Sequence, residues 1–230
     1  MSAIAHLLEY QIQPGHEGEV TGFLRHELLA EPLPDGMVAR FAGRRLSGQG
    51  RQHFVATTWR DPTALAAAID AEGLPPCLAE RASLLGVRTA SSYRLAASTG
   101  LGLEGARVLR LYRTSTALEA VEFWERRAVE TIGRLVATPG LLAAQAGVEI
   151  DGEDPVVRDG QVRIAVLTAW AEWDLLLTAT GGRLDKALLD TEITDLEQPA
   201  SADHFELLRG EPAPEYGSAP GGRPPAPFEE

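Results

Sequence analysis

Cysteine is almost absent from this sequence of 230 residues, and Cys77 is the one exception. A single cysteine cannot form a disulfide within the chain or assemble a cysteine-based zinc site. No apolar run approaches the roughly 20 residues that a membrane-spanning helix needs. Residues 1–13 are polar and lack a basic stretch, so we expect no signal peptide and a cytoplasmic location.

Positive charge is also scarce, because 21 lysine and arginine residues face 33 aspartate and glutamate residues, for a formal net charge of −12. Lys186 is the only lysine. Nucleic-acid binding depends on a basic face that neutralises phosphates, and an anionic membrane surface demands a similar basic cluster. We therefore expect no nucleic acid and no membrane as a partner.

Four short segments recur in the same order in the two halves of the chain. The matched pairs are AHLLEY with RVLRLY, DGMVARFAG with PGLLAAQAG, VATTW with VLTAW, and YRL with FEL. Any one match is weak, whereas four in order indicate a duplication with insertions. The sequence thus predicts two tandem modules, over residues 1–98 and 106–210. The Pro- and Gly-rich residues 211–230 are predicted to form a disordered tail.

Each half has the pattern of a βαββαβ module. In the first half, the predicted strands cover residues 3–11, 37–46, 52–59 and 91–97, with a helix at 17–29. A second helix is predicted to begin at Asp61-Pro62, with Asp61 as its cap. In the second half, strands are predicted at 107–113 and 204–209. Thr116 with Glu119 forms a predicted capping box, and Asp174 is the predicted cap of the next helix.

This order of elements is the ferredoxin-like arrangement, an α+β fold. Such a four-stranded sheet carries helices on one face only, and its bare face must be covered. We therefore predict that the two sheets pack face to face within one chain, as a built-in dimer of modules.

Residues near the strand ends resemble a known family. Gly36-Met37 begins the second strand, the segment TTWRD over residues 57–61 ends the third, and Tyr10 lies at the end of the first. The second half keeps Trp170, followed by Glu172 and Asp174. This pattern resembles the antibiotic biosynthesis monooxygenase (ABM) family of the dimeric α+β barrel superfamily. The resemblance covers roughly residues 4–95 and 107–208.

The resemblance implies cofactor-independent oxidation of a small aromatic or phenolic, polyketide-like compound. In active family members, the tryptophan that closes the third strand lines a cavity between sheet and helices, and Trp59 and Trp170 are its counterparts here. The haem-degrading branch uses a histidine on the second helix and an asparagine on the first strand. This sequence contains no asparagine and offers Glu80 and Arg81 on that helix, so the resemblance does not extend to that activity.

Strand alternation places His6 and Tyr10 on one face of the first strand, and His53 and Trp59 on one face of the third. These strands are neighbours in a ferredoxin-like sheet, so we expect the four side chains to converge as a catalytic site. His6 or His53 would accept the proton of a phenol, which leaves an electron-rich phenolate that reacts with oxygen. Tyr93 joins the two tryptophans as a candidate substrate-binding residue. The second half has Val108 near the place of His6, so the first half is the expected site.

Each candidate also has a simpler interpretation. A tryptophan at a strand end can pack beneath a helix, and a histidine at a sheet rim can bond to backbone or water. The chain would then be a non-catalytic small-molecule-binding or stress-associated barrel, or a haem-binding protein that uses one of its five histidines. The first hairpin carries a group of arginines that fits either an acidic substrate or a solvated face, namely Arg40, Arg44, Arg45 and Arg51.

We expect no metal and no other cofactor. The acidic residues between 151 and 159 lack the ligand spacing of an EF-hand, and no paired-histidine motif or Gly-rich phosphate loop occurs. The expected partner is a small aromatic molecule. The sequence leaves open whether two copies of the two-module chain form a homodimer.

Overall fold

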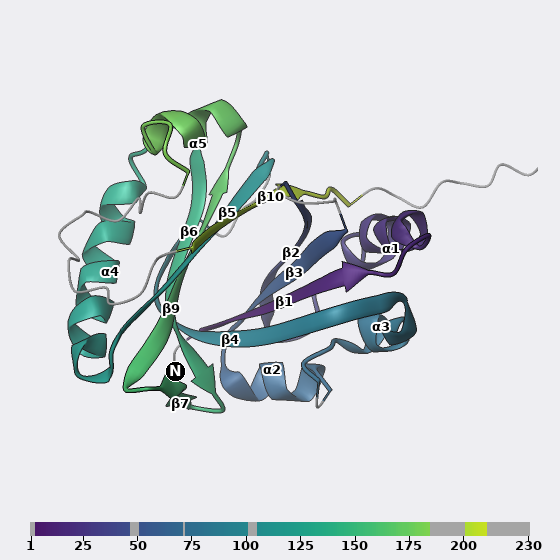
Figure 1. Cartoon of the computed structure of the whole chain (residues 1–230), viewed down its shortest axis with the longest axis horizontal. Coiled ribbons are helices and arrows are strands. Elements are labelled where there is room, and N and C mark those ends of the chain that lie inside the picture. The colour runs from purple at the N-terminus through teal and green to yellow at the C-terminus, as the bar shows by residue number, and fades with distance from the viewer. Residues whose placement is uncertain (1–2, 47–50, 71, 101–104, 185–200, 211–230) are drawn as a thin grey trace, which may run out of the picture.

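A computed structural model describes residues 3–46, 51–70, 72–100, 105–184 and 201–210. The strands in these residues are β1 (Ile4–Ile12), β2 (Met37–Arg45), β3 (Gln52–Trp59), β4 (Leu85–Thr99), β5 (Val108–Ala117), β6 (Leu141–Asp151), β7 (Asp154–Pro155), β8 (Val157–Arg158), β9 (Gln161–Trp170) and β10 (Ser201–Leu207). They form one antiparallel sheet in the order β7-β6-β4-β1-β3-β2-β10-β5-β9-β8 (Figure 1). An additional pairing of β6 with β9 closes the sheet into a ring.

Each half of the chain contributes four neighbouring strands to the ring. The first half supplies β4-β1-β3-β2, and the second half supplies β10-β5-β9-β6. Hydrogen-bonded pairs join the halves at both edges, β4 with β6 and β2 with β10. The prediction of two separate sheets is therefore wrong, although their inner faces do cover each other. Unpaired N–H and C=O groups at a sheet edge favour further pairing, and closure removes both edges.

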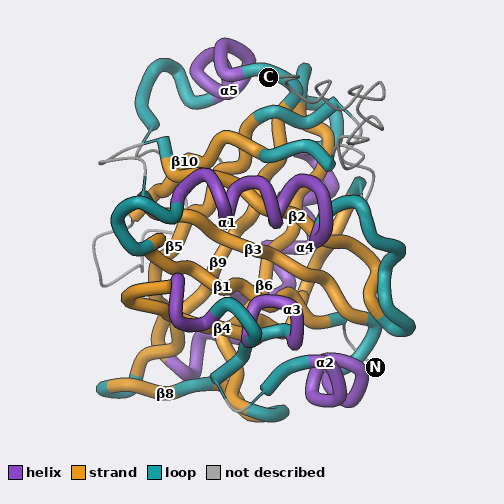
Figure 2. The backbone as a smooth tube through the Cα atoms, turned by 90° about the vertical axis from the view of Figure 1, so that its right-hand side faces the viewer, coloured by secondary structure: helices purple, strands orange, loops and turns teal. Residues whose placement is uncertain are grey.

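Helices cover the outside of the ring (Figures 1 and 2). They are α1 (Glu17–Phe23), α2 (Pro62–Ala68), α3 (Pro76–Ala79), α4 (Val121–Leu135) and α5 (Trp173–Ala179). A π-helical turn at Leu24–Leu28 continues α1, and 3-10 turns occupy Ala82–Leu84 and Leu118–Ala120. The buried face of α4 packs against β4 and β6, and its members are Val121, Trp124, Ala128, Ile132 and Leu135.

The interior of the ring holds an apolar core to which both halves contribute. Leu7 of β1 and Phe54 of β3 meet Leu111 of β5 and Phe205 of β10 in this cluster. The rings of Phe54 and Phe205 have centroids 4.4 Å apart at an angle of 52°. Outward-facing residues of these strands, such as Leu8 and Tyr112, pack beneath the helices, so the strands are buried on both faces.

The starts of three helices test the caps that were predicted from the sequence. The carboxylate of Asp61 accepts a hydrogen bond from the Ala64 amide at 2.9 Å, which confirms the predicted cap of α2. The predicted capping box is wrong, because Thr116 lies buried within β5 and Ala120 precedes α4 without a side-chain cap. Asp174 lies in the first turn of α5 and is not its cap. The end of β5 pairs with the start of β9, a contact between distant segments that overrides the local signal.

The strand register corrects the alignment of the two halves. Ile4 lies opposite Trp59 in the first half, and Val108 lies opposite Trp170 in the second. Val108 therefore corresponds to Ile4, and the counterpart of His6 is Arg110. Both β2 and β6 also carry an irregularity one residue after their start, where the ladder to the neighbouring strand shifts.

Gly36 and Gly140 occupy the same place in the two halves, immediately before β2 and β6. Each has a φ of +80°, in the left-handed region that other residues rarely adopt. A Cβ atom added to Gly140 would lie 2.7 Å from the Cβ of Leu175 in α5. The helix thus packs directly against the glycine backbone.

We predict that Gly140→Ala lowers the free energy of unfolding by about 2 kcal/mol, because it adds both backbone strain and a steric clash. Gly133→Ala is the control, since Gly133 lies within α4 and an added Cβ would meet nothing within 4 Å. That change should be neutral or stabilising by up to about 1 kcal/mol. Urea denaturation measures both, and equal effects would contradict the packing described for Gly140.

No helix in the described part of the chain is long and apolar enough to cross a bilayer. The predicted tail at 211–230 lies outside the described residues. So do residues 47–50, between the second and third predicted strands, and residues 101–104, between the two predicted modules.

Candidate functional site

A cavity of about 920 Å³ lies between the first half of the sheet and α2, and we call it the α2 cavity. Its wall includes Thr57 and Trp59 at the end of β3, and Gly36 and Met37 at the start of β2. Ala64, Ala67 and Ala68 of α2 form the opposite side. The lining is mainly apolar, which suits a small hydrophobic or aromatic ligand.

Trp59 is held in a fixed orientation at this wall. Its side chain is 1% exposed, and its indole N–H donates to the Thr57 hydroxyl at 2.9 Å. Trp170 in the second half donates to Thr168 in the same way, also at 2.9 Å. Trp170 packs with Val108 and with Leu176 of α5, so it lies beneath a helix. This is the simpler of the two roles predicted for a tryptophan at a strand end.

His6 lies on the same sheet face as Trp59 but does not line the α2 cavity. Its Nε2 is 2.9 Å from the carbonyl of Gly73, and its Nδ1 is 3.0 Å from the hydroxyl of Ser92. A carbonyl only accepts, so Nε2 carries the proton and Nδ1 accepts from Ser92. Burial lowers the pKa of His6 below its ordinary value, while the bond to Gly73 opposes this shift. Both ring nitrogens are therefore engaged in a neutral histidine.

Tyr10 and His53 lie at the other end of these strands. The residues face each other across β1 and β3, and their rings stack with centroids 6.1 Å apart at 20°. Burial lowers the pKa of His53, whose Nδ1 lies 3.3 Å from the Arg51 carbonyl. The four predicted catalytic side chains thus share one sheet face, but only Trp59 among them lines the α2 cavity.

Tyr93 points to the opposite side of the sheet. It is buried in the core inside the ring, together with Leu7 and Phe205. Burial raises the pKa of its hydroxyl, and the nearby positive charge of Arg113 opposes that shift. Its predicted role in the cavity of Trp59 is incompatible with this position, because the sheet separates the two.

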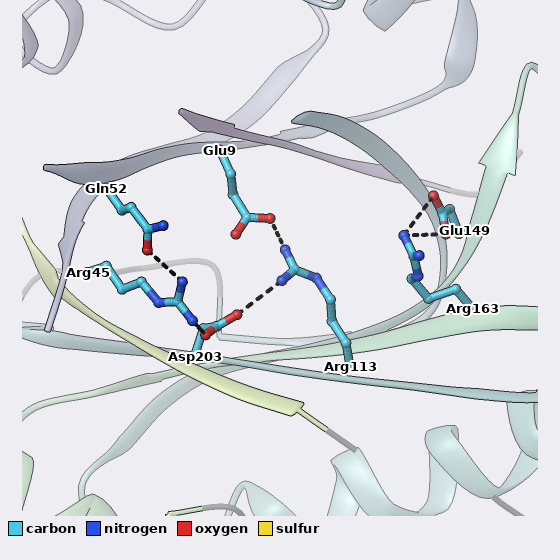
Figure 3. Close-up of polar contacts among 7 residues, drawn as sticks. All are labelled: Glu9, Arg45, Gln52, Arg113, Glu149, Arg163 and Asp203. Atoms are coloured by element: carbon cyan, nitrogen blue, oxygen red, sulfur yellow. Dashed lines mark hydrogen bonds and ion pairs between the residues drawn. The ribbon is translucent and has the colours of Figure 1, made fainter. Parts of the chain in front are cut away.

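A second cavity, of about 420 Å³, lies at one end of the ring interior, and we call it the interior cavity. Polar residues from both halves meet here (Figure 3). Arg113 of β5 pairs with Glu9 of β1 and, at 3.2 Å, with Asp203 of β10. Arg45 of β2 pairs with Asp203 and donates to Gln52 at 2.5 Å. Ion pairs and hydrogen bonds therefore form one continuous chain across the ring.

The sequence predicts Arg45 as part of a basic group but does not indicate this cavity. The structure separates that group, since Arg45 faces the interior cavity and Arg40 faces the α2 cavity. Arg44 forms an exposed ion pair with Glu206 at 2.7 Å. No group of three or more potential metal-ligating side chains occurs within the described ranges.

Comparison with solved structures identifies the fold. A proposed monooxygenase from Fusobacterium nucleatum has a TM-score of 0.68 and 9% identity, with 90% of this chain and 93% of that chain covered. An anthrone oxidase-like protein has a TM-score of 0.62 and 9% identity, covering 94% and 95%. A ferredoxin-fold protein from Listeria monocytogenes, related to antibiotic biosynthesis monooxygenases, has a TM-score of 0.51 and 10% identity, covering 91% and 96%.

The chain has the ABM-like fold. No family model matches its sequence, and no curated protein matches it either. At 9–10% identity the structural likeness establishes the ferredoxin-like α+β architecture and leaves the reaction open. In this ABM-like fold, the α2 cavity and the interior cavity are two sites, lined by described residues, to which chemistry can be assigned.

Proposed function

We propose that the α2 cavity binds a small aromatic compound and that the chain oxygenates it as a cofactor-independent, ABM-like monooxygenase. The α2 cavity itself is the observation that supports this most strongly. It offers a mainly apolar space of about 920 Å³ beside the immobilised indole of Trp59. Monooxygenase and anthrone oxidase-like names among the structural neighbours agree with the reaction.

We also infer that the chain consists of two tandem βαββαβ modules, over residues 1–98 and 106–210, that form a dimeric α+β barrel internally. The shared strand order supports this inference, as do the equivalent Trp59–Thr57 and Trp170–Thr168 hydrogen bonds. The glycines that precede β2 and β6 support it as well. In this proposal the first module retains the working cavity.

The reaction needs no external reductant if the substrate supplies the electrons. For an anthrone, one oxygen atom of O₂ replaces the two hydrogens of the reacting CH₂ group, and the other leaves as water. Removal of the first proton creates the electron-rich anion. His6 is the nearest predicted base to Trp59 in the strand register. Because it does not line the α2 cavity, it would have to release Ser92 and turn toward the cavity to accept that proton at Nδ1.

A non-catalytic binding protein is the second candidate. It is favoured first because the described lining of the α2 cavity includes no histidine and no tyrosine. Both ring nitrogens of His6 are hydrogen-bonded, which is the arrangement of a structural histidine.

Binding and turnover can be tested separately with anthrone as the probe. We predict that Ala67→Trp fills the α2 cavity from its rim and weakens anthrone binding at least about tenfold, since the ligand loses its space. Ala66→Trp is the matched control, because Ala66 is also exposed on α2 but does not line the cavity. Quenching of tryptophan fluorescence measures binding, and an oxygen electrode measures turnover.

Oxygen uptake by the wild-type chain that Ala67→Trp abolishes and Ala66→Trp preserves would support the monooxygenase. Anthrone binding without oxygen uptake would support the non-catalytic candidate. If Ala66→Trp and Ala67→Trp both bind anthrone as the wild-type chain does, the assignment of the α2 cavity is wrong.

A further inference from the structure

The charged side chains that line the interior cavity are mostly basic, although the chain as a whole is acidic. Three arginines line it, Arg45, Arg113 and Arg163, against Glu9 as the single lining carboxylate among the described residues. Their other carboxylate partners, Asp203 and Glu149, do not line the cavity. A ligand inside the cavity would thus meet guanidinium groups that are each paired with a carboxylate, and Figure 3 shows Asp203 between Arg45 and Arg113.

Some N–H donors of the lining arginines are not used in contacts within the described part of the chain and are available to a ligand. A guanidinium has five N–H donors. Arg45 directs two of its terminal nitrogens to Gln52 and Asp203, and its Nε–H is buried without a partner among the described residues. Arg163 contacts Glu149 through one terminal nitrogen, at 3.3 Å. A buried donor without a partner is costly, so an acceptor placed in the cavity would be stabilising.

Neutral hydroxyl groups extend the same donor set. Ser91 and Thr89 of β4 line the cavity beside the arginines. Behind them, the buried Tyr93 hydroxyl lies close to Arg113, which acts on it through its charge and a side-chain hydrogen bond. Donors of this kind recognise oxygen atoms, and carboxylate or phosphate groups offer several in one plane or cluster.

We propose that the interior cavity is a binding site for a small organic oxyanion, a carboxylate or a phosphate, held by Arg45, Arg113 and Arg163. Its volume of about 420 Å³ admits a small metabolite. Guanidinium groups match the geometry of these anions through paired N–H donors. This site is on the other side of the sheet from the α2 cavity, so it does not depend on the function proposed for that cavity.

An occupied interior cavity would also hold the two halves together. Arg45 belongs to the first half, whereas Arg113 and Arg163 belong to the second. A ligand that contacts all three binds only the assembled ring, so it must raise the unfolding temperature by mass action. This stabilisation gives a second readout besides direct binding.

The test titrates the full chain by calorimetry in a phosphate-free buffer of low ionic strength. The probes are inorganic phosphate, succinate and, as an uncharged analogue of succinate, succinamide. We expect at least one anion to bind with a dissociation constant of about 1 mM or tighter and to raise the unfolding temperature, with no binding of succinamide. Which anion binds identifies the oxyanion as a phosphate or a carboxylate.

Arg45→Gln and Arg44→Gln form a matched pair of variants, because the two arginines are adjacent in β2 and only Arg45 lines the cavity. We expect Arg45→Gln to weaken anion binding about tenfold or more, and Arg44→Gln to leave it unchanged. Arg163→Gln serves the same purpose if Arg45→Gln does not fold. Absence of binding by both anions, or equal losses in the Arg44 and Arg45 variants, would overturn the proposal and leave the network a purely structural one.

Discussion

Replacing Arg113 with methionine is expected to lower the free energy of unfolding by about 2–4 kcal/mol. Methionine retains the apolar stem of arginine but removes the charge that Glu9 and Asp203 share. The Arg113 side chain is only 17% exposed, so water compensates poorly for the lost ion pairs. Asp203 keeps its pair with Arg45, whereas Glu9 is left without the guanidinium that balances it. Urea denaturation of the full chain measures the loss.

Arg107→Met is the matched control for this prediction. Arg107 also pairs with a carboxylate, Glu172 at 3.4 Å, but its side chain is 61% exposed. Exposed ion pairs contribute little, so this change should cost at most about 1 kcal/mol. Adding Glu9→Gln to Arg113→Met should recover part of the loss, because the double variant no longer carries the unbalanced carboxylate. If Arg107→Met and Arg113→Met are equally destabilising, the interior network does not join the two halves.

Strand alternation and the internal repeat were sufficient to predict most of the architecture. The third strand was predicted over residues 52–59, where β3 runs from Gln52 to Trp59. The second was predicted one residue too long, and the first was shifted by one residue. These strands are bounded by local turn signals and have apolar residues on both faces, which a single sequence displays directly.

Pairing between distant segments accounts for the two strands whose starts were predicted incorrectly. β4 begins at Leu85, six residues before its predicted start, and this extension pairs with the end of β1. Apolar and polar residues do not alternate regularly in this extension, so its sequence does not predict a strand. Pairing with β1 holds it in the extended conformation. β10 begins at Ser201 for a similar reason, since it is held between β2 and β5.

The interior cavity could not be predicted, because its residues have the sequence pattern of a solvated face. Glu9 and Arg163 lie between apolar or aromatic residues, as exposed residues of an open sheet do, whereas Arg45 and Arg113 have a polar neighbour in the sequence. Closure of the ring turns this face inward at one end. The charged side chains then pair with one another inside the ring, and residues that appear solvated in the sequence line a cavity.

The proposed catalytic cluster was only partly predictable for a related reason. Alternation correctly placed His6, Tyr10, His53 and Trp59 on one face, and the register confirms that the strands are neighbours. The partners that determine the role of each side chain come from elsewhere in the chain. Gly73 and Ser92 lie 67 and 86 residues from His6, and no local pattern indicated that they would engage its ring.

Acid is expected to destabilise the second half through His204, by about 2–3 kcal/mol between pH 6.5 and pH 4. Burial and the positive charge of Arg110 lower the pKa of His204 to about 4, although Asp203 opposes the shift. The unfolded chain binds a proton near pH 6.5 and the folded chain does not, so stability falls as the pH drops through this window. His204→Phe should remove this part of the pH dependence while an aromatic ring still packs against Trp173. Unfolding free energies at pH 7 and pH 4.5 measure it, and the exposed His16→Gln variant should retain the wild-type difference. An unchanged pH dependence in His204→Phe would show that His204 titrates normally.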